Sequence, residues 1–197
     1  MRRGSLLSLV LALAGLAAPA GAVELTLTYG ALERVIWARL LTQGGRYYLE
    51  GSSTDDCRYA LVQEPKVSAQ GNRLAVRFVF SGRAAARVAG RCVGPGDTLD
   101  VTASGLPRYE AGEIRLADLR LSAPESAYFK LVAPLLQSRL RERLSYPLRA
   151  ELEQALGAAA VAAGSPLRPR LVSLGVGSIL VEAQRLRLSV DLSLTVE

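Results

Sequence analysis

The chain has 197 residues with 24 basic and 18 acidic side chains, and it contains no histidine. The absence of histidine excludes Ser-His and Cys-His nucleophile pairs, zinc held by histidine and a histidine general base. The basic side chains are arginines except for Lys66 and Lys130, and no basic tract is interleaved with aromatic residues, which argues against a nucleic-acid-binding protein. A mild positive charge is typical of a solvated surface, and it also favours approach to anionic lipid.

The first segment has the three parts of a secretory signal peptide. Arg2 and Arg3 precede the apolar run Leu6–Leu16, and Ala20-Gly21-Ala22 fits the A-x-A cleavage pattern. The run is shorter than the ~20 residues of a membrane-spanning helix. We therefore expect residues 1–22 to be cleaved near Ala22, and residues 23–197 to form one soluble domain in the periplasm or outside the cell. No cysteine follows the apolar run, so a lipid anchor is not expected.

The mature part begins with a strand and a short helix. Leu25 and Leu27 alternate with polar residues in the way of a half-buried strand. Apolar residues then recur at helical spacing between Ala31 and Leu41, and Gly44-Gly45 ends this helix.

A strand-rich stretch follows the first helix. Alternation and turn signals predict strands at 46–51, at 58–67 with an interruption at Pro65, at 73–80, at 98–104 and at 113–122. The spacing between Leu116 and Leu119 breaks the period of two, which indicates a bulge. Residues 107–112 are predicted to turn.

The pattern then becomes helical. Ser122 and Glu125 have the spacing of a capping box, and a leucine stripe continues to Leu156. Pro134 and Pro147 lie inside this stretch, so we expect either one long bent helix over 124–156 or two helices end to end.

Two further strands complete the chain. One is predicted at 171–174, and another runs over 179–197 with a bend between Val181 and Leu186. The predicted fold class is α+β: a curved antiparallel sheet wrapped around the long helix of the C-terminal half, elongated, with the short N-terminal helix closing one end.

The two cysteines are expected to pair. In an oxidising compartment, Cys57 and Cys92 most simply form a disulfide, because their spacing is not that of a C-x-x-C redox site.

This order of elements resembles the YceB-like envelope proteins of the tubular lipid-binding superfamily, which includes SMP and BPI-type domains. The resemblance rests on Leu25–Tyr29 with the helix that follows, on Gly105–Leu119, and on Ser126–Leu148 with its Leu131–Leu136 segment. It implies an elongated fold whose helix and curved sheet enclose an apolar groove for a lipid chain, and it offers no catalytic residues. Members of that family are often lipoproteins, whereas this chain has no lipidation cysteine.

The candidate groove residues are apolar side chains of the predicted strands and the long helix. They are Leu74, Val76, Phe78, Phe80, Val132, Leu136, Leu140, Leu144, Leu188, Leu192 and Leu194. For each one alone, core packing is the better explanation. The hypothesis is that together they leave a ligand-sized apolar cavity.

The polar candidates are few. Asp55-Asp56 lies in a Ser/Thr-rich loop without further acidic ligands at ion-binding spacing, and the glycines at 90, 94 and 96 lack the Lys-Ser/Thr ending of a phosphate loop. Glu151 and Glu153 are expected on a solvated helix face. Arg139, Arg141 and Arg143 with Glu142 form a charged face that could contact a partner or anionic lipid. We therefore expect no catalytic residue, metal or cofactor.

Three functions remain open at this point. The first is an exported, non-enzymatic protein that holds a lipid or another apolar small molecule between helix and sheet. The second is an envelope structural or protein-interaction module with a filled core, which binds through the arginine face or a sheet edge. The third and weakest is a hydrolase, whose base would have to be Lys66, Lys130 or a carboxylate.

Overall fold

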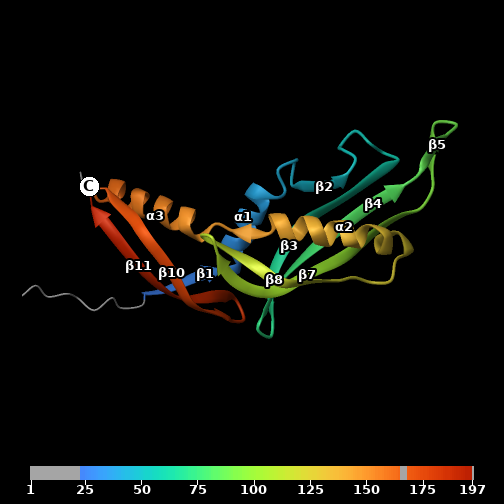
Figure 1. Ribbon diagram of the computed structural model, residues 1–197. Helices are drawn as coiled ribbons and strands as arrows, with labels where there is room; N and C mark the ends of the chain where they lie inside the picture. Colours follow the sequence, from blue (N-terminus) through green and yellow to red (C-terminus); the bar gives the residue numbers. More distant parts are fainter. Residues whose placement is uncertain (1–22, 165–167, 197) are drawn as a thin grey trace, which may run out of the picture.

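The computed structural model describes residues 23–164 and 168–196, so the predicted signal peptide lies outside the described residues. This part of the chain is α+β, with antiparallel sheets, strong curvature and an elongated outline (Figure 1). Its helices are α1 (Tyr29–Arg39), α2 (Ala127–Arg143) and α3 (Leu148–Ala162).

The larger sheet forms one half of the molecule. Its six strands are hydrogen-bonded in the order β2-β3-β4-β7-β8-β9. Their bounds are β2 (Arg46–Glu50), β3 (Arg58–Gln70), β4 (Arg73–Ala84), β7 (Gly96–Glu110), β8 (Glu113–Ser122) and β9 (Ser145–Tyr146). Helix α2 contacts β7 and β8 and also β2, which shows how far the sheet curves around this helix.

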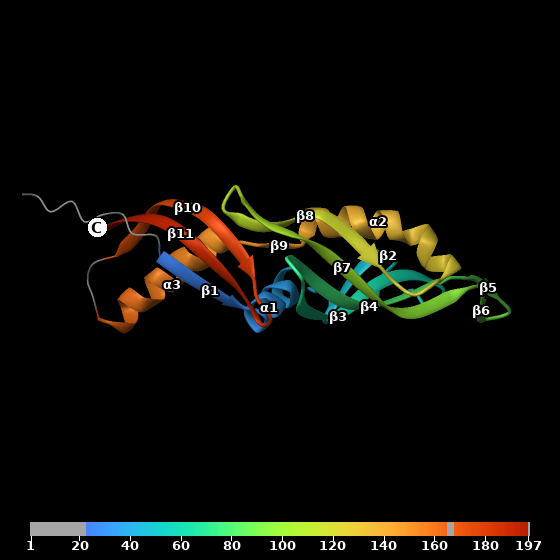
Figure 2. The same cartoon turned by 90° about the horizontal axis from the view of Figure 1, so that it is seen from below.

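The smaller sheet forms the other half. It has the order β1-β11-β10, with β1 (Val23–Thr28), β10 (Pro169–Val181) and β11 (Arg185–Val196). Helix α3 lies over one face of this sheet, and α1 lies between the two halves (Figures 1 and 2). A separate hairpin of β5 (Ala86–Val88) and β6 (Arg91–Val93) projects at the far end of the large sheet.

One buried cluster connects these elements. Leu186 and Leu188 of β11 belong to the same core as Phe78 and Phe80 of β4 and Leu140 of α2, and all five side chains are fully buried. Phe80 also packs edge-on against Phe129, with ring centroids 5.2 Å apart. The described residues therefore share a single hydrophobic core that crosses from one sheet to the other.

The long helix is divided, which decides between the two expectations from the sequence. α2 ends at Arg143 and α3 begins at Leu148, with β9 between them. Pro147 has no N–H to continue the helical hydrogen bonds, and it disfavours helical geometry at Tyr146 before it. Pro134, in contrast, is accommodated inside α2. The sheet is therefore not wrapped around one long helix: α2 lies on the large sheet and α3 on the small one.

The helix start and the last strands also differ from the prediction. The N-cap of α2 is Ser126, whose hydroxyl accepts a hydrogen bond from the N–H of Phe129 at 3.0 Å, so the expected capping box at Ser122 is wrong. The single strand expected over 179–197 is a hairpin of β10 and β11. The predicted turn at 107–112 is shorter, because β7 continues to Glu110.

Both expected irregularities of the large sheet are present. The register of β3 against β4 shifts between Gln63 and Lys66, on either side of Pro65. The register of β7 against β8 shifts between the pairs Ser104–Arg120 and Leu106–Ala117, and Asp118, which lies in this interval, has a φ of 49°. A left-handed residue at a bulge re-aims the following side chains, and Leu119 is thereby turned into the core.

Candidate functional site

An apolar pocket lies where the two sheets meet, beside α1. Its walls come from α1, β3, β4, β8, β11 and the connection between α2 and α3. They are lined by Leu32, Val35, Ile36, Val67, Leu74, Val76, Ile114, Leu116, Leu144, Ser145, Tyr146 and Leu186. Its volume is about 30 Å³, far below the ~300–1,000 Å³ of typical small-ligand sites.

The lining contains few polar side chains. The polar side chains among the lining residues are those of Ser145 and Tyr146. Burial raises the pKa of the Tyr146 phenol, and the nearby charge of Glu151 adds to the shift, so the phenol stays neutral at physiological pH. The remaining lining residues are aliphatic, so the surface of the pocket is almost entirely apolar.

Helix α1 is held at both sheets. The Glu33 carboxylate accepts a hydrogen bond from the N–H of Val67 in β3 at 2.9 Å and lies 3.8 Å from the Lys66 ammonium. The Tyr29 hydroxyl donates a hydrogen bond to the carbonyl of Glu182 at the β10–β11 turn. These contacts keep the apolar side of α1, with Leu32 and Ile36 buried, against the pocket.

The apolar face of β11 leads from this pocket to the end of the molecule. Leu186, which lines the pocket, is fully buried, as are Leu188 and Val190. Further along the same face the burial falls, with Leu192 half-buried, Leu194 42% exposed and Val196 59% exposed. We call Leu192, Leu194 and Val196, together with Val23 of the neighbouring β1, the distal apolar face.

The side chains of helix α3 also become less buried toward the same end of the molecule. Leu148 at its start is buried, Leu152 and Leu156 are half-buried, and Val161 near its end is 80% exposed. The start is fixed by Arg149, whose N–H donates to the carbonyl of Gly112 at 3.0 Å and whose guanidinium donates to the carbonyl of Leu171 at 2.9 Å. The helix is therefore anchored beside the pocket and is lightly packed beyond it.

The structure separates the predicted groove residues into three groups. Leu74, Val76 and Leu144 line the apolar pocket. Most of the others are core residues, of which Phe78, Phe80, Leu136, Leu140 and Leu188 are fully buried and Val132 is half-buried. Leu192 and Leu194 belong to the distal apolar face. Between α2 and the large sheet, the members of the set are closely packed, with Phe78, Phe80, Leu136 and Leu140 completely buried.

The polar candidates lie on the surface in separate places. Lys66 pairs with Glu33, and Lys130 lies 3.6 Å from Glu125. Arg139, Arg141 and Arg143 are exposed on α2 as expected. Glu153 is exposed and pairs with Arg149 at 3.0 Å, whereas Glu151 is half-buried, which corrects its predicted exposure. Among the described residues there is no group of three or more acidic or cysteine side chains placed to hold a metal ion.

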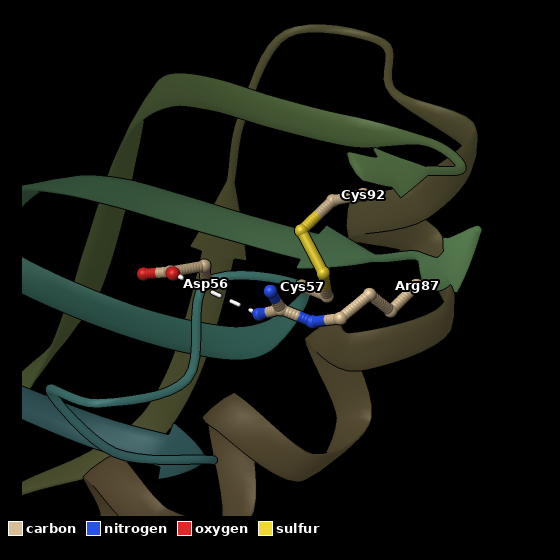
Figure 3. The surroundings of a disulfide bond; sticks show 4 residues. All are labelled: Asp56, Cys57, Arg87 and Cys92. Atoms are coloured by element: carbon tan, nitrogen blue, oxygen red, sulfur yellow. Dashed lines mark ion pairs between the residues drawn. A yellow bond between two sulfur atoms is a disulfide. The ribbon is translucent and has the colours of Figure 1, made fainter. Parts of the chain in front are cut away.

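Cys57 and Cys92 form the expected disulfide, with Cα atoms 5.1 Å apart (Figure 3). The bond ties the start of β3 to β6 of the projecting hairpin. Beside it, the Asp56 carboxylate lies 3.8 Å from the guanidinium of Arg87. Disulfides of this kind persist in oxidising compartments, and no helix in the described ranges has the length and apolar character needed to span a bilayer.

Two features were missed from the sequence. The first is the contribution of α1 to the pocket wall, because an amphipathic helix on its own does not indicate what its apolar side faces. The second is the β5–β6 hairpin, whose strands are very short. Its signal is the two-residue turn Ala89-Gly90, in which both residues have positive φ, 47° and 77°, as a type I′ hairpin turn requires.

Comparison with known proteins identifies one structural similarity and no sequence relative. A scan against protein-family models finds no match, and a search of the curated proteins finds none either. Among solved structures, the chain is similar to one described as "Crystal structure of lipopolysaccharide binding protein", with 12% sequence identity and a TM-score of 0.34. The match covers 90% of this chain and 51% of that one, so the chain spans about half the length of that protein.

Proposed function

We propose that this is an exported, non-enzymatic protein that binds an apolar ligand, a lipid acyl chain in the first instance. This is also the function implied by the sequence resemblance to YceB-like, tubular lipid-binding proteins. The observation that carries the proposal is the continuous apolar face of β11, which begins at the apolar pocket beside Leu186 and ends exposed at Leu194 and Val196. An apolar strip that reaches from a core to an open end is a path along which a chain can be taken out of water.

The ligand would lie on the distal apolar face, beneath α3, with its end directed toward the pocket. Each methylene removed from water contributes about 0.8 kcal/mol. Because the pocket itself is about 30 Å³, a chain that enters it has to displace its walls, and the ligand would stabilise a minor, more open conformation. The lightly packed end of α3 is the element that would move, since its start is fixed by Arg149.

Export is supported by two independent features. Residues 1–22 have the three-part pattern of a signal peptide, and disulfides such as Cys57–Cys92 form and persist mainly in oxidising compartments. An envelope location would bring the protein into contact with membrane lipids.

The test is native mass spectrometry of the protein purified from cells, followed by titration with the fluorescent fatty acid cis-parinaric acid. We expect a lipid adduct and saturable fluorescence enhancement. Leu194→Glu places a charge on the distal apolar face, so it should weaken binding by about tenfold or more. Thr195→Glu is the matched control, because Thr195 is exposed and strand alternation places it on the opposite face. A wild-type protein that carries no lipid and does not enhance the probe would refute the proposal.

The second candidate function is protein interaction through the same face. The small sheet has β1 and β10 at its edges, and an open edge beside exposed aliphatic side chains is also suited to pairing with another chain. The same mass spectra decide between the two functions. A dimer or a protein complex without lipid, abolished by Leu194→Glu but not by Thr195→Glu, would favour the interaction module.

A further inference from the structure

A polar trough runs over the outer face of the large sheet, on the side away from the core. It consists of two adjoining hollows of about 390 and 400 Å³ that share the side chains of Tyr59 and Arg83. Each volume is within the range of small-ligand sites. Because alternate residues of a strand point to opposite faces, Tyr59 lies in the trough while its neighbour Ala60 is buried in the core.

The floor and walls of the trough combine apolar and polar groups. Leu61 is only 6% exposed and yet lies on this outer face, outside the main core cluster. Its cross-strand neighbour Tyr48 and the nearby Tyr59 supply two half-buried aromatic rings. Neither of their hydroxyl groups has a protein hydrogen-bond partner within the described residues. The rings are thus available for stacking and the hydroxyls for hydrogen bonding.

The loop between β2 and β3 forms one wall. The Ser52 hydroxyl donates a hydrogen bond to the Asp55 carboxylate at 3.1 Å. The two ends of the loop are joined by the ion pair of Arg58 with Glu50 at 2.7 Å, and the disulfide follows directly at Cys57. The wall is therefore preformed, and a ligand would not have to order it.

The trough has no excess of positive charge. Arg46 and Arg83 line it, and within the described residues neither guanidinium has an ion pair or a side-chain hydrogen bond. Three carboxylates also line it, those of Asp55 and Asp56 in the first hollow and of Asp97 in the second, and Asp56 lies 3.8 Å from Arg87. A site for phosphate or another anion would carry a clear positive excess. The mixture of both signs without such an excess favours a neutral ligand that both donates and accepts hydrogen bonds.

From these features we infer that the trough is a binding site for a neutral carbohydrate, a short oligosaccharide that occupies both hollows. The C–H faces of the sugar rings would stack on Tyr59 and Tyr48, since an aromatic side chain offers a large apolar face at a wet boundary. The hydroxyl groups would bind the planar side chains of Arg83 and Asp55, which donate and accept respectively. The site shares no side chain with the pocket and is independent of the proposed lipid binding.

The test is saturation-transfer NMR with maltotriose, cellotriose and chitotriose as separate probes, with inorganic phosphate as a competitor. At least one sugar should receive saturation from the protein and should not be displaced by phosphate. Tyr59→Ala and Arg83→Ala should each weaken binding of this sugar by about tenfold. Tyr59→Phe keeps the aromatic ring and should retain most of the binding affinity. Arg77→Ala is the matched control for Arg83→Ala, because Arg77 lies on the same strand, β4, and pairs with Asp100 outside the trough.

Two outcomes would overturn this inference. One is the absence of saturation transfer to all three sugars at millimolar concentration. The other is a sugar signal that is unchanged in both Tyr59→Ala and Arg83→Ala, or that phosphate removes. The thermal unfolding of each variant is recorded in parallel. If Tyr59→Ala is poorly folded, Arg83→Ala keeps the test decisive, because Arg83 is exposed on the sheet surface and its removal leaves the core intact.

Discussion

The position of α2 against the large sheet can be tested with two leucines of the same helix. Leu136 is fully buried in the core, while Leu131, just over one turn earlier, is 79% exposed. Leu136→Ala removes a side chain whose burial is worth about 1.5–3 kcal/mol and leaves a cavity in addition, so the loss of unfolding free energy should be about 2–5 kcal/mol. Leu131 buries only about a fifth of its surface, and its replacement by alanine should change stability by less than about 0.5 kcal/mol.

The assay is guanidinium unfolding under non-reducing conditions, followed by the fluorescence of Trp37, the one tryptophan of the sequence. The two variants should have the same dependence of free energy on denaturant and differ in midpoint. If both variants lose the same amount, or if Leu131→Ala loses more, then the side of α2 that faces the sheet has been assigned wrongly, and the account of a filled core fails with it.

Two further predictions concern the covalent and the pH-dependent contributions to stability. Replacing both Cys57 and Cys92 by serine should lower the unfolding free energy by about 4 kcal/mol in the chain-entropy model, for a closed loop of this length; equal stability of wild type in reducing and non-reducing denaturant would contradict this. Tyr29→Phe removes the hydrogen bond to the Glu182 carbonyl and should cost about 1 kcal/mol at pH 7. Burial, and secondarily the charge of Glu182, raises the pKa of Tyr29. Its stabilisation is therefore fully present below the ordinary tyrosine pKa of 10.0 and is lost as the pH rises through the folded-state pKa, so wild type and variant should converge in unfolding titrations at strongly alkaline pH.

The fold could be predicted from the sequence where local chemistry and periodicity agree. The strand expected at 113–122 has the same bounds as β8, and the irregularity before Leu119 is present. The prediction failed at β10 and β11, because the turn between them, Glu182-Ala183-Gln184, contains none of the residues that normally indicate a turn. This turn is closed by a backbone hydrogen bond from the N–H of Glu182 to the carbonyl of Arg185 at 2.9 Å. The Glu182 carboxylate also pairs with Arg185 at 2.6 Å and with Arg187 at 2.8 Å.

The candidate site was less predictable than the fold. Alternation identifies which side chains point inward, and Leu74, Val76 and Leu144 do line the apolar pocket. Alternation does not predict whether the inward side chains of the helix and of the sheet are in contact with each other. That depends on how closely the helix approaches the sheet. Around α2 the two elements meet fully, and Leu136 and Leu140 are completely buried. The apolar face is exposed elsewhere, at Leu194 near the end of β11, where the helix above it is a different one.

The division of the helix at Pro147 explains why one half of the molecule is closed and the other is open. An uninterrupted helix would have to continue in the direction of α2, whereas the break lets α3 take its own course over the small sheet. The start of α3 is fixed most firmly, through Leu148 in the core and Arg149 on the carbonyl of Leu171, whereas Leu152 and Leu156 further along are only half-buried. The exposed end of the apolar face, at Leu194 and Val196, therefore lies in the half of the molecule that α3 covers and not in the half that α2 closes.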